Sequence, residues 1–161
     1  MTNIRNILQT LINNDIEFVI IGGVAAIALG SDYPTSDLDI CYSRTTENLQ
    51  RLSSVLLSLD AKLRNVPPDI PFTPDAPTLK SGLNFTFTTS LGALDILGEV
   101  GGIGFYNEVK KFSNEEIVFG LKCFVLNLDG LLLSKKFAGR KKDEPVIIEL
   151  EAIKEMLQKK K

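Results

Sequence analysis

The sequence predicts a single α/β (α+β) domain over residues 1–161, with helices packed on a mixed central sheet. Short strand-like runs rich in β-branched residues alternate with segments of helical periodicity along the chain. Hydrophobic residues make up 44% of the chain and charged residues 24%, which is typical of a globular protein. A chain of 161 residues is also long enough to form one hydrophobic core of its own.

The first elements follow from apolar spacing and from turn residues. Apolar side chains at i, i+3, i+4 and i+7 predict a helix over residues 4–11, which the polar residues 13–15 end. Residues 17–21 then predict a short strand. After a glycine turn, residues 24–29 predict a short apolar helix that ends at Gly30.

A second strand and a longer helix come next. Residues 31–36 predict a polar loop, and residues 38–42 predict the second strand. Thr45 or Thr46 is a suitable N-terminal cap for a helix that extends to Leu59, because leucines recur along one side of it.

The middle of the chain predicts a hairpin between two loops. Residues 64–80 hold five of the seven prolines and predict a loop. Residues 83–89 alternate apolar and polar side chains as a strand does, and residues 93–97 return as its hairpin partner after a turn at residues 90–92. The glycines within residues 98–104 predict a further loop.

The last third of the chain predicts one strand and two helices. Residues 121–126 form a short apolar run that is typical of a strand. Residues 128–138 predict a helix that Gly139 ends. Residues 145–157 predict a second helix, with Asp143 as its cap and a proline tolerated in its first turn.

The composition excludes several classes of protein and site. The chain contains no histidine, which excludes His-containing catalytic triads and His-based zinc sites. Cys41 and Cys123 each lie in an apolar run, so we interpret them as reduced core thiols. No apolar run reaches the roughly 18 residues of a membrane span, and the N-terminus lacks the apolar segment of a secretory signal. We therefore expect a cytoplasmic protein with no membrane partner.

Charge is distributed unevenly along the chain. Residues 135–161 hold nine of the 18 Lys and Arg residues against five acids, a local net charge of +4. The first 134 residues hold nine bases and fifteen acids, a local net charge of −6. The basic end can attract a polyanion, although a run such as Lys159–Lys161 is also typical of a solvated helix end.

Three aspartates in strand-like runs are the strongest functional signal. Asp37 and Asp39 stand two residues apart, so their side chains share one face of a strand, and Asp95 lies in another apolar run. If Asp95 lies on an adjacent strand of the same orientation, the three carboxylates converge and repel one another unless cations lie among them. Carboxylate oxygens suit Mg²⁺ or Mn²⁺, and two such ions can orient an in-line attack on a phosphate. A lone Asp-x-Asp is alternatively a solvated strand face.

A pair of glycines fits the same scheme. Gly22 and Gly23 directly follow the first predicted strand, where the bare backbone can approach a phosphate and the next helix offers free amides. Taken alone, such a pair is more often only a tight turn. Its place between a strand and the paired aspartates favours a phosphate-binding turn beside a metal site.

Two segments resemble the signature of a known superfamily. GGVAAIALGSDYPTSDLDI, residues 22–40, resembles that of the DNA polymerase β-like nucleotidyltransferases: a glycine turn, a spacer, and an Asp-x-Asp flanked by hydrophobic residues. Leu94-Asp95-Ile96 is similar to the third carboxylate of that family. Residues 133–143 are similar to the Lys-x-x-Ala-Gly-Arg-x-Lys-Asp segment of small prokaryotic members related to AbiE-type toxins.

The resemblance implies a nucleotidyltransferase-like domain and a set of site residues. Asp37, Asp39 and Asp95 would be the catalytic residues and would bind Mg²⁺ (or Mn²⁺). Gly22 and Gly23 would hold the nucleoside triphosphate.

The resemblance also assigns two basic residues to the site, and in one respect the chain departs from the family pattern. Lys135 and Arg140 match basic positions of the family segment and would bind the nucleotide phosphates. Alternatively, Lys135 only extends along apolar surface, because it lies at helical spacing from several leucines. Many small members carry Arg four residues before the first aspartate, where this chain has Tyr33, whereas Thr35 matches. A cationic contact to the phosphate or to the acceptor is therefore missing.

We expect a Mg²⁺-dependent nucleotidyltransferase that moves a nucleoside monophosphate from an NTP to an acceptor hydroxyl. The acceptor is a tRNA, a protein or a small molecule. The alternative is a catalytically weak nucleotide-binding or toxin–antitoxin interaction module of the same fold. A Rossmann dinucleotide binder fits less well, because Gly22 and Gly23 lack the Gly-x-Gly-x-x-Gly spacing.

Overall fold

The computed structural model describes residues 2–160; Met1 and Lys161, the ends of the predicted domain and of the terminal lysine run, lie outside the described residues. Within this range the strands form a seven-stranded sheet and a separate two-stranded hairpin. The strands are β1 (Phe18–Ile21), β2 (Asp37–Tyr42), β3 (Lys62–Leu63), β4 (Asn84–Thr89), β5 (Gly92–Leu97), β6 (Glu99–Val100), β7 (Gly104–Phe105), β8 (Ser113–Val118) and β9 (Leu121–Leu126).

Helices interrupt and follow these strands, so the chain is a mixed α/β domain. The predicted helices at the two ends of the chain and after β2 are present. The helices are α1 (Ile4–Asn13), α2 (Gly22–Ala28), α3 (Thr46–Ser58), α4 (Ala76–Ser81), α5 (Tyr106–Lys111), α6 (Leu128–Ala138), the 3₁₀ turn η1 (Lys141–Asp143) and α7 (Glu144–Lys159).

The larger sheet has the order β3-β4-β5-β2-β1-β9-β8. β2 pairs in parallel with β5, and β1 pairs in parallel with β9. The other neighbouring strands are antiparallel, including the β4–β5 hairpin. The mixed central sheet that the sequence predicts is therefore confirmed.

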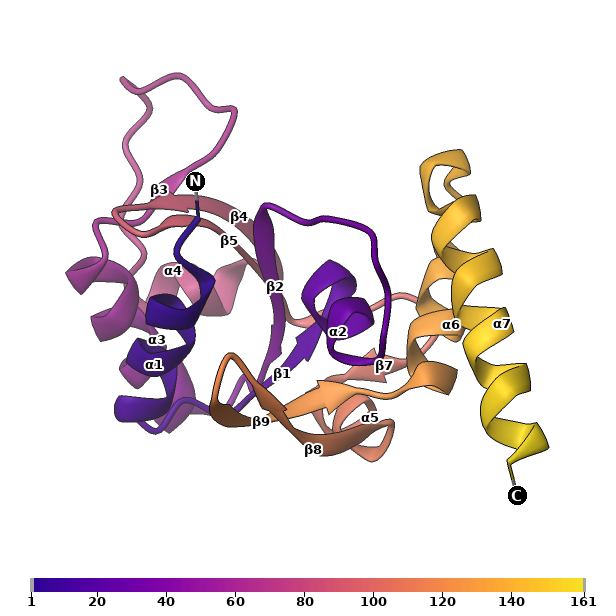
Figure 1. Ribbon diagram of the computed structural model, residues 1–161. Helices are drawn as coiled ribbons and strands as arrows, with labels where there is room; N and C mark the ends of the chain where they lie inside the picture. The colour runs from indigo at the N-terminus through magenta and orange to yellow at the C-terminus, as the bar shows by residue number, and fades with distance from the viewer. Residues whose placement is uncertain (1, 161) are drawn as a thin grey trace.

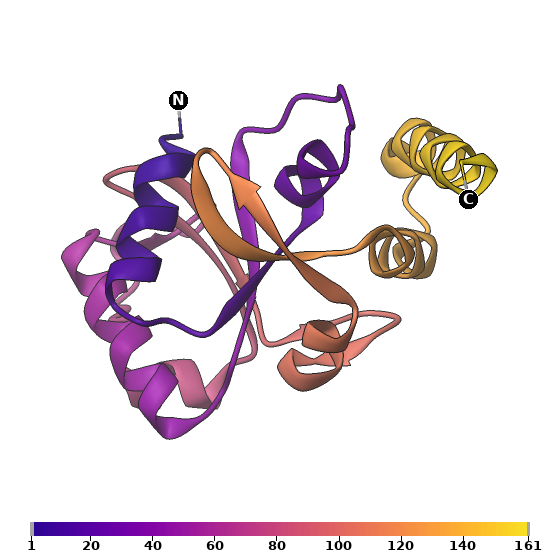
Figure 2. The ribbon, with the colours of Figure 1, turned by 60° about the horizontal axis from the view of Figure 1, so that its bottom comes forward.

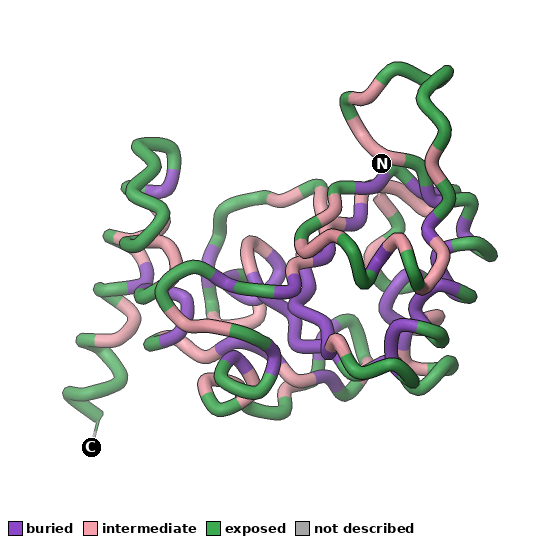
Figure 3. Tube along the Cα trace, turned by 180° about the vertical axis from the view of Figure 1, so that it is seen from behind, coloured by how far each residue is buried: buried purple, intermediate pink, exposed green. Residues whose placement is uncertain are grey.

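Helices lie on both sides of this sheet. Figure 1 shows α1, α3 and α4 grouped on one side, and α2, α6 and α7 on the other. Figure 2 shows α6 and α7 lying side by side beyond the edge of the core, and these two helices are in contact. Figure 3 shows the buried residues concentrated around the sheet, whereas α7 is mostly exposed and buries only Leu150. No helix among the described residues is long and apolar enough to cross a membrane.

The segment 64–80, predicted to be a loop, contains the start of a helix. Asp75 caps α4 by accepting a hydrogen bond from the Thr78 amide at 2.9 Å. Pro77 stands in the first turn of α4, where its missing amide removes no intrahelical bond. A high proline content therefore predicts a loop even where a short helix forms.

Residues 98–104 were predicted to be a loop and instead carry the β6–β7 hairpin. The sequence also predicts neither α5 nor β8. β8 is an edge strand of sequence SNEEIV, and its paired glutamates disrupt the alternation that identifies a half-buried strand.

The predicted cap of α7 is right in position but not in its side-chain hydrogen bond. Asp143 precedes this helix, but its side chain makes no capping hydrogen bond. Its carboxylate instead accepts hydrogen bonds from Arg140 Nε at 2.8 Å and from Lys135 Nζ at 3.5 Å. The aspartate therefore organises the basic segment rather than the helix end.

Candidate functional site

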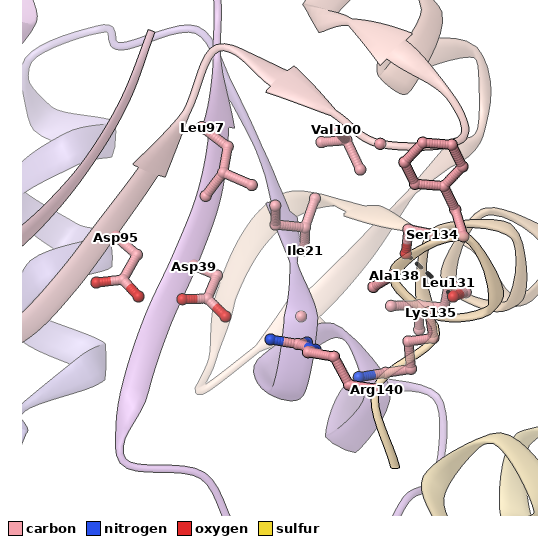
Figure 4. Close-up of a pocket in the computed structure, with 13 residues that line it drawn as sticks. Ile21, Asp39, Asp95, Leu97, Val100, Leu131, Ser134, Lys135, Ala138 and Arg140 are labelled. Carbon is pink, nitrogen blue, oxygen red and sulfur yellow. Dashed lines mark hydrogen bonds between the residues drawn. The ribbon is translucent and has the colours of Figure 1, made fainter. Parts of the chain in front are cut away.

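The floor of the site is a pair of carboxylates on parallel strands. Asp39 of β2 and Asp95 of β5 are direct neighbours in the register. Leu38 and Ile40 are fully buried on the opposite face of β2, which directs Asp39 toward the open side of the sheet. Figure 4 shows the carboxylates of Asp39 and Asp95 side by side. Asp37 projects from the same face, opposite Ala93.

The pair is electrostatically costly without a cation. Burial, and after it repulsion by Asp95, raises the pKa of Asp39 to about 7. Lys135 acts in the opposite direction and lowers this pKa. Asp39 therefore ionises readily only when more positive charge lies beside it.

The glycine turn packs directly against the carboxylate pair. Gly22 has a φ of +67°, and a Cβ there would collide with the Asp39 carboxylate. A Cβ on Gly23 would lie 2.8 Å from the Thr35 side chain. The two glycines are therefore required by close approach and not only by a turn, and they bring the backbone of α2 next to Asp39.

A basic wall faces the carboxylates from α6 and the segment after it. The Lys135 side chain is only 11% exposed, and its ammonium lies 3.5 Å from Asp143 Oδ1. Arg140 binds the other Asp143 oxygen at 2.8 Å. Burial raises the pKa of Asp143, but these two cations outweigh it and leave that pKa below its usual value. In Figure 4 the ends of Lys135 and Arg140 enter the cavity opposite Asp39.

Arg64 is a site residue that sequence reasoning missed. Its Nη2 donates to Asp95 Oδ1 at 2.5 Å, and its Nη1 lies 3.8 Å from Asp37 Oδ2. Arg64 directly follows β3, and its side chain also donates to the Phe87 carbonyl of β4. No local motif marks this arginine, because only the order β3-β4-β5-β2 brings it to the aspartates.

The carboxylates line two adjoining cavities, called here the polar lobe and the apolar lobe. Both lobes share Gly22, Asp39, Asp95, Lys135 and Arg140. The polar lobe, of about 330 Å³, is otherwise lined by Gly23, Ala26, Ser31, Tyr33, Pro34, Thr35, Asp37, Lys142, Asp143 and Val146. The apolar lobe, of about 410 Å³, is otherwise lined by Ile21, Leu97, Val100, Gly101, Leu131, Ser134, Phe137 and Ala138.

The donor set fits a hard divalent cation in part. Mg²⁺ usually takes one or two carboxylates together with substrate phosphates and water, and Asp39 with Asp95 supply such a pair. Across residues 2–160, however, no three Asp, Glu, Cys or His side chains are grouped closely enough to hold an ion. Arg64 lies between Asp37 and Asp95, so two of the three carboxylates, including Asp95 of this pair, contact a guanidinium.

Tyr33 borders the polar lobe at the position where the resembling family carries Arg. Its side chain is exposed and its amide donates to the Ser31 hydroxyl at 3.2 Å. The cations of the polar lobe come instead from Lys135, Arg140 and Lys142.

Solved structures share this fold over nearly the whole chain. A proposed nucleotidyltransferase of Thermotoga maritima, TM1012, matches with a TM-score of 0.59 and 16% identity, covering 99% of this chain and 96% of that one. The lincosamide antibiotic adenylyltransferase LnuA, solved with lincomycin, matches with a TM-score of 0.60 and 16% identity, covering 93% and 95%. ANT(2'')-Ia, solved in complex with adenylyl-2''-tobramycin, matches with a TM-score of 0.60 and 12% identity, covering 98% and 95%.

No protein-family model matches the chain, and no curated protein matches it in sequence. At these low identities the likeness establishes the fold, which is that of the nucleotidyltransferase neighbours.

Proposed function

We propose that this protein transfers a nucleoside monophosphate from an NTP to an acceptor hydroxyl, with Mg²⁺ (or Mn²⁺) as cofactor and pyrophosphate as the second product. The observation that carries the proposal is a row of residues across three strands. Ile21, Asp39 and Asp95 are successive neighbours on β1, β2 and β5, and Gly22 directly follows Ile21. The glycine turn and the two carboxylates therefore lie in line.

This row gives the reaction a direction. In-line displacement needs the leaving pyrophosphate and the attacking oxygen on opposite sides of the transferred phosphorus. We place the pyrophosphate at Gly22, Gly23 and the basic wall. The acceptor then approaches from beyond Asp95, where β4 presents the exposed Thr86 as the register neighbour of Asp95.

The chemistry balances with the residues at hand. A bond forms between the acceptor oxygen and the α-phosphorus, and the bond from that phosphorus to the bridging oxygen of pyrophosphate breaks. Asp95 takes the proton of the acceptor hydroxyl, because it lies on the acceptor side of the row. Lys135 stabilises charge on the triphosphate, since its ammonium is held inside the cavity by Asp143.

Asp39 and Asp95 are the residues proposed to hold Mg²⁺, together with oxygens of the triphosphate. When bound, the ion neutralises phosphate charge and orients the α-phosphate for attack. Arg64 contacts Asp95 at 2.5 Å and Asp37 at 3.8 Å, so Asp95 binds the ion by giving up part of this contact, and Asp37 joins the set only if it too leaves Arg64. Gly22 and Gly23 allow the triphosphate to lie close to the carboxylates, because no side chain stands between them.

We propose a hydroxylated small molecule as the acceptor. Two of the structural neighbours are named as antibiotic adenylyltransferases or were solved with an adenylylated antibiotic. The tRNA and protein hydroxyls that the sequence leaves open are separated from this class by the experiment below.

A catalytically weak nucleotide-binding module, including a toxin–antitoxin component, is the second candidate. The Arg64 contacts favour it, because a guanidinium between Asp37 and Asp95 neutralises the carboxylates that catalysis needs. The likeness of residues 133–143 to AbiE-related proteins is its sequence basis.

The test is transfer of label from each NTP in the presence of Mg²⁺. The purified protein is incubated with lincomycin, with tobramycin, and with a cell lysate that is afterwards separated into RNA, protein and small molecules. We expect Asp39→Asn to lower transfer at least about a hundredfold while calorimetry still detects NTP binding. Asp69→Asn is the matched control, because Asp69 is exposed and borders neither lobe.

Equal transfer by Asp39→Asn and the parent would rule out the proposed mechanism. A parent that binds NTP but labels no fraction would support the binding module instead.

A further inference from the structure

The apolar lobe has a different character from the rest of the cavity. Apart from the five residues shared with the polar lobe, it offers Ser134 as its one polar side chain among the described residues, and that hydroxyl donates to the Leu131 carbonyl at 3.1 Å. Its walls come from two places: Leu97 and Val100 beside the sheet, and Phe137 with its neighbours on α6. Figure 4 shows Val100 and Leu97 facing Leu131 and Ala138 across this space.

Phe137 is unusually exposed for a residue that is held in place. It is 70% exposed, yet the turn of the β6–β7 hairpin packs on it. A Cβ on Gly101 would lie 2.6 Å from Phe137 Cδ1, and a Cβ on Gly102 would lie 2.9 Å from Phe137 Cβ. Glycine backbone therefore fixes the aromatic side chain while leaving most of it uncovered, which suits a stacking platform.

The reaction axis decides which part of the substrate reaches this lobe. Pyrophosphate and acceptor lie at the two ends of the row across β1, β2 and β5. The apolar lobe instead extends along the strands, from Asp39 toward Leu97 and Val100. The nucleoside is attached to the α-phosphate beside this axis, so it is the part of the substrate that enters the lobe.

We propose that the apolar lobe binds the nucleobase of the NTP, with Phe137 as its stacking platform. This inference rests on the proposed function. A volume of about 410 Å³ lies within the roughly 300–1,000 Å³ of small-molecule sites. The lobe offers stacking area and few groups for reading base edges, so purines bind more tightly than pyrimidines and ATP and GTP bind alike.

A comparison of ATP with inorganic triphosphate separates the binding of the base from the binding of the phosphates. Calorimetry with Mg²⁺ compares ATP, CTP and inorganic triphosphate on the parent and on Phe137→Ala. We expect Phe137→Ala to weaken ATP binding about tenfold and to leave triphosphate binding unchanged. Phe137→Trp should restore ATP binding, because it returns an aromatic face to the lobe. Phe119→Ala, an exposed aromatic that borders neither lobe, should change nothing.

Each other outcome is decisive. If Phe137→Ala weakens ATP and triphosphate equally, the side chain supports the fold and the stacking role is wrong. If ATP binding is unchanged, the base lies elsewhere, although triphosphate binding that depends on Lys135 would leave nucleotidyl transfer standing. If the parent binds neither ATP nor triphosphate, both the subsite and the proposed function fail.

Discussion

Two glycine pairs in this chain each follow a strand, and they differ in what they pack against. Gly22 and Gly23 follow β1 and meet the Asp39 carboxylate and the Thr35 side chain. Gly101 and Gly102 follow β6 and meet the side chain of Phe137. In both places the backbone passes too close for a Cβ. A glycine pair therefore indicates that the backbone passes close to another residue. The chemistry of the site comes from that other residue.

The largest expected effect is on stability, and it differs between the two glycine pairs. Gly22→Ala forces alanine to a φ of +67° and against the Asp39 carboxylate, so we expect a loss of about 2–4 kcal/mol in the free energy of unfolding. Gly101→Ala meets only the Phe137 ring and should cost about 1–2 kcal/mol. Urea denaturation measures both.

A double variant tests the cause. In a Phe137→Ala background the Gly101→Ala cost should largely disappear, because the ring is gone. The Gly22→Ala cost should be the same in both backgrounds. A Gly101→Ala cost that survives the removal of Phe137 would show that the hairpin turn itself, and not the ring, requires glycine.

The sequence predicts the first pair far better than the second. Gly22 and Gly23 stand between a β-branched strand and Asp37-x-Asp39, so local order suffices to suggest their role. Gly101 lies about 36 residues before Phe137, and the contact between them depends on how α6 returns to the sheet. Arg64 is hidden for the same reason, because it reaches Asp95 across β4.

The next effect is a pH dependence that belongs to the Asp39–Asp95 pair beside the first glycine pair, and not to Phe137. The pKa of Asp39 is raised to about 7, so the folded state holds a proton that the unfolded chain, with a carboxyl pKa of 3.8, has released. This stabilisation is complete below pH 3.8 and is lost as pH rises to about 7. Without divalent cations, the parent should lose on the order of 2 kcal/mol across this window, allowing for solvent screening.

Asp39→Asn should flatten that dependence, and Phe137→Ala should not. Thermal unfolding from pH 4 to pH 8 in the presence of a chelator measures it. A parent and an Asp39→Asn variant with parallel pH profiles would place the titration on another group.

Lys135 lines both lobes, and its substitution should weaken binding of the phosphates and not of the base. Lys135→Ala should weaken inorganic triphosphate and ATP equally, by about tenfold at low salt, and the parent affinity should fall as salt rises. Lys136→Ala is the matched control, because Lys136 is 56% exposed and pairs with Glu151 outside the cavity. If Lys135→Ala binds triphosphate as tightly as the parent, Lys135 only completes the Asp143 cluster.

Arg64 provides the smallest expected effect, on the side of the carboxylates away from both glycine pairs. Its guanidinium binds Asp95 and lies 3.8 Å from Asp37 Oδ2, so it competes with a metal ion for the same oxygens. Arg64→Gln removes this charge and should tighten Mn²⁺ binding in the absence of nucleotide about threefold, the scale of a partly exposed ion pair. Titration of Mn²⁺ by electron paramagnetic resonance measures this without any turnover.

Lys62→Gln is the matched control for Arg64→Gln, because Lys62 lies two residues away on β3 and, among the described residues, pairs only with the exposed Asp60 at 3.7 Å. It should change Mn²⁺ affinity less than Arg64→Gln does, since within residues 2–160 no ion pair joins Lys62 to the three aspartates. Weaker Mn²⁺ binding by Arg64→Gln would reverse the interpretation: the arginine would then hold Asp95 in the position that the ion needs. Tighter binding together with lower transfer would show that the guanidinium also contacts the acceptor, because the acceptor is proposed to approach from this side of Asp95.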